Sequence, residues 1–274
     1  MIGKFAAFYI KKRGLKMDSH ILSVENLSKH FIINKGFSDK AIIEAVKEVS
    51  FELKQGDSLG LIGESGCGKT TVANLILRLI EPSSGEIHLF SDNVTYLNEA
   101  KMRRYRKDIQ IVFQHSSAVL DPKMTIGELI QEPLAIHDIV GAKEYDIETD
   151  RLLKLVGLAV SEKNKYPYQL SGGQNQRVII ARAIATRPRI IVCDEPVASL
   201  DVSVQGQILN LLTNLKQEMN LTYLFITHDL KVMKHICNRI AVMYKGSIVE
   251  IGDSADILNN PTHSYSKVLM ESVL

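Results

Sequence analysis

The chain has 274 residues, of which 45% are hydrophobic and 23% charged, as in an ordinary globular protein with a sizeable core. Its formal net charge of +2 gives no electrostatic reason to expect a nucleic-acid partner. Cys67, Cys193 and Cys237 lie far apart in the sequence. This spacing argues against a disulfide framework or a structural zinc site, and it favours a reducing compartment.

Residues 1–20 are predicted to be a basic N-terminal tail. A short apolar run over residues 5–10 precedes a group of lysines and an arginine. This run is shorter than the roughly 7–15 residues of a secretory signal core, and no run in the chain approaches the roughly 18–20 residues that span a bilayer. Three interpretations stay open: a loosely attached tail, an upstream start codon with Met17 as the true start, and an amphipathic segment that touches a membrane surface.

The first half of the chain has the pattern of strands around one strong helix. Apolar and polar residues partly alternate over residues 21–55, which predicts strands, and the apolar run 59–62 predicts a buried strand. Apolar residues at helical spacing predict a helix from Lys69 to Ile80, which Pro82 and the residues after it end. Further strands are predicted at 87–90 and 109–113.

The second half alternates helices and strands. Residues 116–187 are mostly helical in pattern, and Ser171 can cap a helix that ends before Pro188. A strand at 190–192, a helix at 201–219, a strand at 223–226 and a hairpin of 240–244 with 247–251 follow. The alternation predicts an α/β sheet, in which residues 116–187 form a helical insertion.

Residues 63–70 read Gly-Glu-Ser-Gly-Cys-Gly-Lys-Thr and fit the pattern GxxxxGK[ST] between a predicted strand and a predicted helix. Glycines let successive backbone N–H groups converge on phosphates, Lys69 supplies a charge for the β- and γ-phosphates, and the Thr70 hydroxyl can bind Mg²⁺. The sequence therefore predicts a phosphate-binding loop, here called the P-loop. Its expected nucleotide ligands are Gly63, Glu64, Ser65, Gly66, Cys67, Gly68, Lys69, Thr70 and Thr71.

Two acids, Asp194 and Glu195, stand at the end of the buried strand predicted at 190–192, after Cys193. An acid at the end of a buried strand can hold Mg²⁺, directly or through water, opposite a P-loop. A second acid beside it can orient and deprotonate an attacking water molecule. We assign Asp194 to the metal and Glu195 to the general base.

Taken together, these segments resemble the nucleotide-binding subunit of ABC transporters over about residues 21–270. The family's signature matches Leu170-Ser171-Gly172-Gly173-Gln174 letter for letter, and its glutamine loop matches Gln114. Its D-loop matches Ser199-Leu200-Asp201, and its switch histidine matches His228. The motifs also follow one another in the family's order.

The resemblance implies an α/β fold: a P-loop NTPase (RecA-like) core with an N-terminal antiparallel β subdomain and an inserted α-helical subdomain at about 116–187. Residues 21–274 would form a single ABC ATPase domain. ATP and Mg²⁺ would be its cofactors. The implied metal ligands are Thr70, Gln114 and Asp194, and the implied catalytic residues are Glu195, His228 and Gln114.

The resemblance also implies that the signature acts on a second subunit. In the family, Ser171, Gly173, Gln174 and their helix N-terminus meet the γ-phosphate held by a partner's P-loop, with Asp201 nearby. The family's adenine-stacking aromatic matches Phe31, although many members have Tyr there. Two alternatives stay open: Phe31 as a core strand residue, and Phe37 as the stacking ring.

Several segments resemble the oligopeptide, dipeptide and nickel importers, among them residues 63–69, 116–124 and 260–265. The implied partners are a second ABC ATPase subunit, related but distinct, two integral membrane permease subunits and an extracytoplasmic substrate-binding protein. The chain would lie peripherally on the cytoplasmic face of the cell membrane. We expect no nucleic acid and, without a cysteine after Cys237, no iron–sulfur cluster.

The motifs disfavour two other functions. A soluble ABC ATPase that acts on nucleic acid or the ribosome would usually carry long coiled-coil or zinc insertions or two fused modules. A non-hydrolysing subunit would have lost a catalytic residue, whereas Lys69, Glu195 and His228 are all present. The motifs therefore favour an importer ATPase, while the cargo stays open among oligopeptides, dipeptides, nickel and metal chelates.

Overall fold

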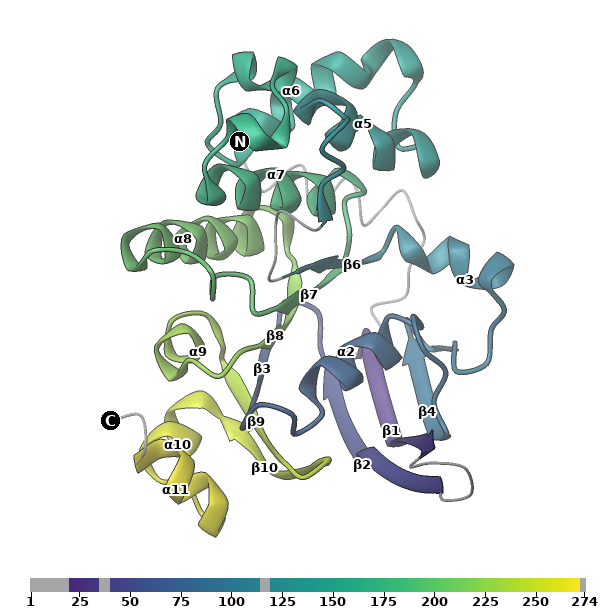
Figure 1. The fold of residues 1–274 in the computed structure, drawn as a ribbon, viewed down its shortest axis with the longest axis vertical. Helices are drawn as coiled ribbons and strands as arrows, with labels where there is room; N and C mark the ends of the chain where they lie inside the picture. The colour runs from purple at the N-terminus through teal and green to yellow at the C-terminus, as the bar shows by residue number, and fades with distance from the viewer. Residues whose placement is uncertain (1–19, 35–39, 114–118, 272–274) are drawn as a thin grey trace. The chain divides into compact units, whose positions relative to one another are not determined.

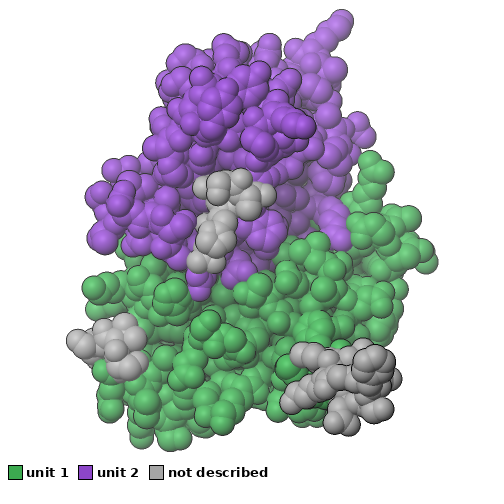
Figure 2. All heavy atoms as spheres, in the orientation of Figure 1, with its two compact units in different colours: residues 1–105, 222–274 green, residues 106–221 purple. Residues whose placement is uncertain are grey.

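The computed structural model describes residues 20–34, 40–113 and 119–271, so Phe37, Gln114 and nearly all of the predicted basic tail lie outside the described residues. The chain divides into two compact units, residues 1–105 with 222–274 and residues 106–221, which Figure 2 distinguishes by colour. Among the described helices, none has the length and apolar character needed to cross a membrane.

The first unit contains a four-stranded antiparallel sheet in the order β2-β1-β4-β5, labelled in part in Figure 1. The strands are β1 (Leu22–Asn34), β2 (Lys40–Leu53), β4 (Ser84–Leu89) and β5 (Asp92–Asn93). Val24 lies opposite Phe51 on one side and Ile87 on the other, and all three side chains are buried. The strands predicted over residues 21–55 are thus confirmed, and their alternating pattern gives the sheet an apolar face.

The same unit contains a second group of strands that leads to the P-loop. Strand β3 (Ser58–Ile62) pairs in parallel with β8 (Thr222–Ile226) and with β9 (Arg239–Tyr244), and β9 forms a hairpin with β10 (Ser247–Asp253). Every residue of β3 and β8 is buried. Continuous apolar runs are typical of parallel strands covered on both faces, and these strands and the hairpin are confirmed.

The helices described in this unit are α2 (Lys69–Ile76), α3 (Glu99–Arg106), α9 (Leu230–Ile236), α10 (Ser254–Asn259) and α11 (Ser264–Glu271). The predicted extension of α2 to Ile80 is wrong. Arg78 adopts a left-handed φ of 52° after the last helical turn. Its N–H bonds the carbonyl of Leu75, and the N–H of Leu79 bonds the carbonyl of Asn74, which is the Schellman pattern of a helix end.

The second unit contains most of the predicted helical block and two parallel strands, β6 (Ile109–Val112) and β7 (Ile190–Asp194). Among its described residues, the α-helices are α5 (Ile126–Ile136), α6 (Tyr145–Leu155), α7 (Gly172–Ala185) and α8 (Val202–Met219). Three 3₁₀ turns lie at Ala142–Glu144, Val160–Asn164 and Pro167–Gln169. Buried Leu129, Leu152 and Val178 come from α5, α6 and α7, which contact one another. Their apolar faces thus form this unit's helical core.

Candidate functional site

The P-loop follows β3 directly and ends at the first turn of α2. Gly68 occupies the N-cap position with a left-handed φ of 110°, and a Cβ there would lie 2.2 Å from the carbonyl oxygen of Ala45. A Cβ on Gly63 would lie 2.2 Å from the carbonyl oxygen of Met243. Side chains are excluded at both positions, so the glycine pattern has a steric cause in this chain.

The Lys69 ammonium group is anchored inside the P-loop. Lys69 is only 7% exposed, and its Nζ donates to the carbonyl oxygens of Gly63 at 2.7 Å and Glu64 at 2.8 Å. A buried ammonium needs such acceptors. Glu64, Ser65, Gly66 and Thr70 are exposed, so the loop faces solvent while its lysine is held from within. This arrangement can accept an anion at the N-terminus of α2.

In the second unit, Ser171 caps α7 as predicted. Its hydroxyl accepts a hydrogen bond from the N–H of Gln174 at 3.3 Å, and the Gln174 side chain accepts from the N–H of Ser171 at 2.9 Å. This reciprocal capping box fixes the first turn of the helix. A Cβ on Gly173 would lie 2.5 Å from Val204 on α8, which explains the small residue there. Ser171 and Gly172 are exposed.

Asp194 is the last residue of β7, and Glu195 follows it in a left-handed conformation with a φ of 48°. This conformation is uncommon outside glycine, and Pro196 further restricts the residue before it. Such local strain persists only where the surrounding structure fixes it, often at functional sites. The chain then turns, and Asp201 stands exposed at the N-cap of α8.

His228 lies in the first unit, in the loop between β8 and α9. The N–H of Asp229 donates to the Thr227 hydroxyl at 3.1 Å, and the Asp229 carboxylate accepts from the N–H of Lys231 at 2.7 Å. These bonds fix the residues on both sides of His228, while His228 itself is exposed. The loop therefore presents the imidazole to solvent at the carboxyl end of a parallel strand, where α/β folds commonly bind ligands.

Phe31 is not a core residue. Its side chain on β1 is 40% exposed, opposite Ile43 on β2, and the Lys29 ammonium lies 5.1 Å from the centroid of its ring. The interpretation of Phe31 as a buried strand residue is therefore wrong, whereas its adenine-stacking role stays a prediction.

Cys67 and Cys193 are both buried.

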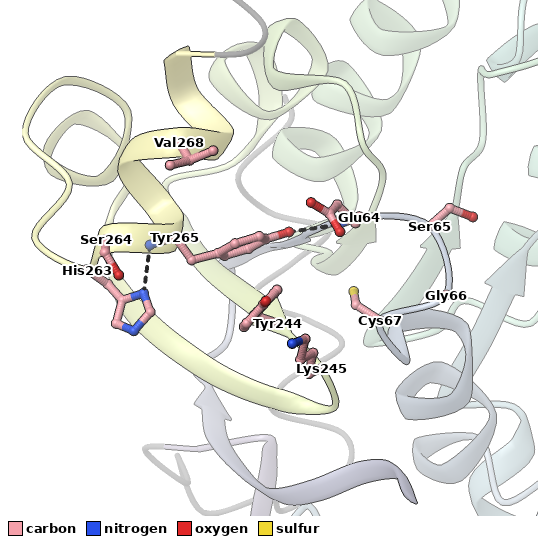
Figure 3. A pocket seen from close by; sticks show the side chains of 10 residues that line it. All are labelled: Glu64, Ser65, Gly66, Cys67, Tyr244, Lys245, His263, Ser264, Tyr265 and Val268. Carbon is pink, nitrogen blue, oxygen red and sulfur yellow. Dashed lines mark hydrogen bonds between the residues drawn. The ribbon is translucent and has the colours of Figure 1, made fainter. Parts of the chain in front are cut away.

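The structure adds a contact that the sequence did not predict. Tyr265, at the start of α11, accepts a hydrogen bond from the backbone N–H of Glu64 in the P-loop at 3.1 Å (Figure 3). Its ring stacks on Tyr244 with centroids 4.1 Å apart. These residues line an open cavity of about 560 Å³ beside the P-loop. The only sequence signal was the resemblance of residues 260–265 to the oligopeptide, dipeptide and nickel importers, which indicates a branch of the family and does not predict a contact.

Glu250 on β10 holds the chain segment that leads into α11. Its carboxylate accepts from the N–H of Thr262 at 2.7 Å, from the Thr262 hydroxyl at 2.8 Å and from the N–H of His263 at 3.1 Å. Burial disfavours its charge, but the Ser266 hydroxyl and the donors on Thr262 and His263 outweigh burial and lower the pKa of Glu250 to about 2. The ionised carboxylate is thus part of the folded structure.

Glu250→Gln is expected to lower the free energy of unfolding at pH 7 by on the order of 1 kcal/mol, after allowance for solvent screening. Because the folded pKa lies below the unfolded value, the stabilisation is complete above pH 5 and is lost as the pH falls towards about 2. Urea unfolding of wild type and variant between pH 7 and pH 3 measures this. The difference in free energy of unfolding between wild type and variant should become smaller as the pH falls. Glu81→Gln, at an exposed residue, is the control. A difference in free energy of unfolding that does not change with pH would contradict the role of the ionised Glu250 carboxylate.

Known proteins with similar sequences point to one family. The sequence model of the family described as ABC transporter matches residues 46–198. The oligopeptide transport ATP-binding protein AppF of Bacillus subtilis is 43% identical over 92% of this chain and 78% of that protein. The glutathione import ATP-binding protein GsiA of Escherichia coli K12 is also 43% identical over 92% of this chain, which spans only 41% of GsiA.

Solved structures agree. The ATP-binding cassette MJ0796, in a dimeric post-hydrolysis state bound to ADP and Pi, has a TM-score of 0.75 and 31% identity, covering 85% of this chain and 98% of that one. CbiO1 from Clostridium perfringens, part of the ABC transporter complex cbiONQ, has a TM-score of 0.77 and 27% identity, covering 89% and 92%.

These comparisons confirm the predicted P-loop fold class and the resemblance to the oligopeptide importer branch. They also confirm that ATP is the nucleotide and that the chain is of the ATPase type. On sequence, motifs and fold together, the chain belongs to the ABC transporter family, as one of its ATP-binding ATPase subunits.

Proposed function

We propose that the chain drives uptake through a membrane importer, as one of two ATPase subunits that hydrolyse ATP to ADP and phosphate at their shared interface. The observation that supports this most is the exposed, capped start of α7 at Ser171. The first N–H groups of a helix lack intrahelical partners and favour an anion. The γ-phosphate held by another subunit's P-loop is the anion that the signature would meet.

The catalytic roles follow the sequence predictions, within one ABC ATPase domain over residues 21–274 that has its helical part at about 116–187. Glu195 would take the proton of the attacking water, and His228 would hold the γ-phosphate and orient that water. Gln114 would contact the water from the glutamine loop. Phe31 would stack on the adenine, and the P-loop would bind the phosphates through its backbone N–H groups and Lys69.

Mg²⁺ fits the donors that the chain offers. Thr70 is an exposed residue on the first turn of α2 and carries a hydroxyl, and Asp194 ends β7 with a carboxylate. Such hard oxygen ligands suit Mg²⁺, which also binds phosphate oxygens directly. We assign the protein ligands to Thr70, Gln114 and Asp194. When bound, the ion would neutralise charge that develops on the transferred phosphoryl group.

The proposed partners are a second, related but distinct ABC ATPase subunit, two integral membrane permease subunits and an extracytoplasmic substrate-binding protein. The chain would lie on the cytoplasmic face of the membrane. Residues 114–140, which include α5, are the proposed coupling surface for a permease helix. Relatives named for oligopeptide transport and glutathione import favour short peptides as cargo, since glutathione is itself a tripeptide.

The test is co-purification of the assembled complex, followed by ATPase assays in lipid vesicles with candidate cargoes. We expect the membrane subunits to co-purify and short peptides to stimulate hydrolysis. The inactive control is a complex that carries Lys69→Ala together with the matching change in its ATPase partner. Stimulation by nickel or a metal chelate alone would contradict the peptide assignment. Absence of any membrane partner would contradict the importer assignment.

A further inference from the structure

The P-loop forms a hydrogen bond with Tyr265, a residue that lies far from it in the sequence. The Tyr265 hydroxyl oxygen accepts a hydrogen bond from the N–H of Glu64 at 3.1 Å, across 201 positions of sequence (Figure 3). The turn between β9 and β10 makes a second hydrogen bond to the P-loop, in which the N–H of Gly246 donates to the carbonyl of Cys67 at 3.1 Å. Both contacts lie within the first compact unit.

The peptide group that Tyr265 contacts is also the one that anchors Lys69. The N–H of Glu64 and the carbonyl of Gly63 belong to one planar peptide unit, so fixing one end fixes the other. That carbonyl accepts from the Lys69 ammonium at 2.7 Å. A chain of two hydrogen bonds therefore links the Tyr265 hydroxyl to the Lys69 ammonium through a single peptide plane.

Tyr265 is itself firmly positioned. Its ring stacks on Tyr244 at an interplanar angle of 30°, and its N–H donates to Nδ1 of His263 at 3.2 Å. The Glu250 carboxylate fixes the backbone of His263 in turn. Burial raises the pKa of Tyr265 above its ordinary value, so its hydroxyl is neutral at physiological pH. Because its ring and its backbone are both held by neighbouring residues, the hydroxyl oxygen of Tyr265 can act as a rigid acceptor.

We propose that Tyr265 is a positioning residue for the P-loop, which orients the Gly63–Glu64 peptide and through it the Lys69 ammonium that contacts the nucleotide's β- and γ-phosphates. Helix α11 thereby becomes part of the ATP-binding apparatus. The inference rests on the proposed nucleotide-binding role of the P-loop and adds to it a C-terminal element that sets ATP affinity.

Tyr265→Phe removes the acceptor and keeps the stacked ring. The test is titration of the full chain with a fluorescent ATP analogue, together with ATPase kinetics of the assembled complex. We expect the dissociation constant and the KM for ATP to rise about fivefold, the effect of one typical hydrogen bond. The kcat should change less than twofold, because the bond acts on binding in the ground state and the transition state alike.

A double-mutant cycle separates positioning from mere support of α11. In a Lys69→Ala background, Tyr265→Phe should alter affinity less than twofold, since the ammonium through which it acts is gone. Tyr96→Phe, at a side chain that is 69% exposed, is the matched control and should leave affinity unchanged. Tyr265→Leu also removes the ring stack and reports the structural contribution through the thermal midpoint.

The outcomes are distinct. Wild-type affinity in Tyr265→Phe, with a lowered midpoint in Tyr265→Leu, would overturn the inference and leave Tyr265 a structural residue. An equal loss of affinity with and without Lys69 would also overturn it. Failure of the wild-type chain itself to bind ATP would instead contradict the proposed function.

Discussion

Glu195→Gln, combined with the matching change in a distinct partner subunit, is expected to abolish steady-state ATP hydrolysis by the assembled complex while leaving ATP binding intact. Glutamine keeps the size and hydrogen-bonding reach of glutamate but cannot accept the proton of the attacking water. Loss of a general base typically costs about 10²- to 10⁴-fold in rate. The left-handed backbone at Glu195, fixed directly after β7 and before Pro196, is not altered by this change. The amide should therefore occupy the position of the carboxylate.

The measurement is phosphate release by the purified complex, alongside nucleotide titration of the same preparation. Glu218→Gln, at an exposed residue near the end of α8, is the matched control and should retain wild-type hydrolysis. The Glu195 variant should also accumulate as an ATP-bound dimer. Near-normal turnover would show that another group takes the proton and would remove Glu195 from its assigned role.

Ser171→Arg, introduced in every copy of the chain and at the matching residue of a distinct partner subunit, is the second change with a large expected effect. It removes the cap that accepts from the N–H of Gln174, a loss of about 1 kcal/mol for α7. It also places a bulky cation at the positive end of a helix where we expect the γ-phosphate. We expect hydrolysis to fall at least about 100-fold, as when donors to a transition state are lost.

The P-loop of the Ser171→Arg chain should still bind ATP, because Ser171 lies in the other compact unit and contributes nothing to the Lys69 anchor. Nucleotide titration should therefore give an affinity within twofold of wild type, while ATP-dependent dimers disappear from size-exclusion chromatography. Ser161→Arg, an exposed position in the same unit, provides the control. Retained ATP-dependent dimerisation with full hydrolysis would refute the role of the signature.

Much of the site could be predicted from sequence because its determinants are local. The capping box of α7 is encoded within the four residues Ser171–Gln174, and the structure forms both of its hydrogen bonds. The P-loop glycines likewise reflect steric limits at fixed spacing, as the close approach of the Ala45 carbonyl to Gly68 illustrates. Local rules of this kind require no knowledge of distant partners.

Other features could not be predicted, since they depend on the folded environment. The apolar spacing of α2 continues to Ile80, yet the helix ends at Ile76. The Arg78 side chain donates to the carbonyls of Val94 and Ile80, which offsets the cost of its left-handed backbone. The contact of Tyr265 with the P-loop joins residues 201 positions apart, and no periodicity in the sequence reports such a pairing.

The central claim is that the chain cannot complete its own catalytic site. It is tested most directly by purifying ATPase pairs through two different tags, with Lys69→Ala and Ser171→Arg placed either in one subunit or in opposite subunits. For a distinct partner chain, the second change goes at its matching residue. If each signature serves the other subunit's P-loop, both changes in one subunit should abolish hydrolysis, whereas the split pair should keep one working site. Activity in the first pair and none in the second would contradict the account.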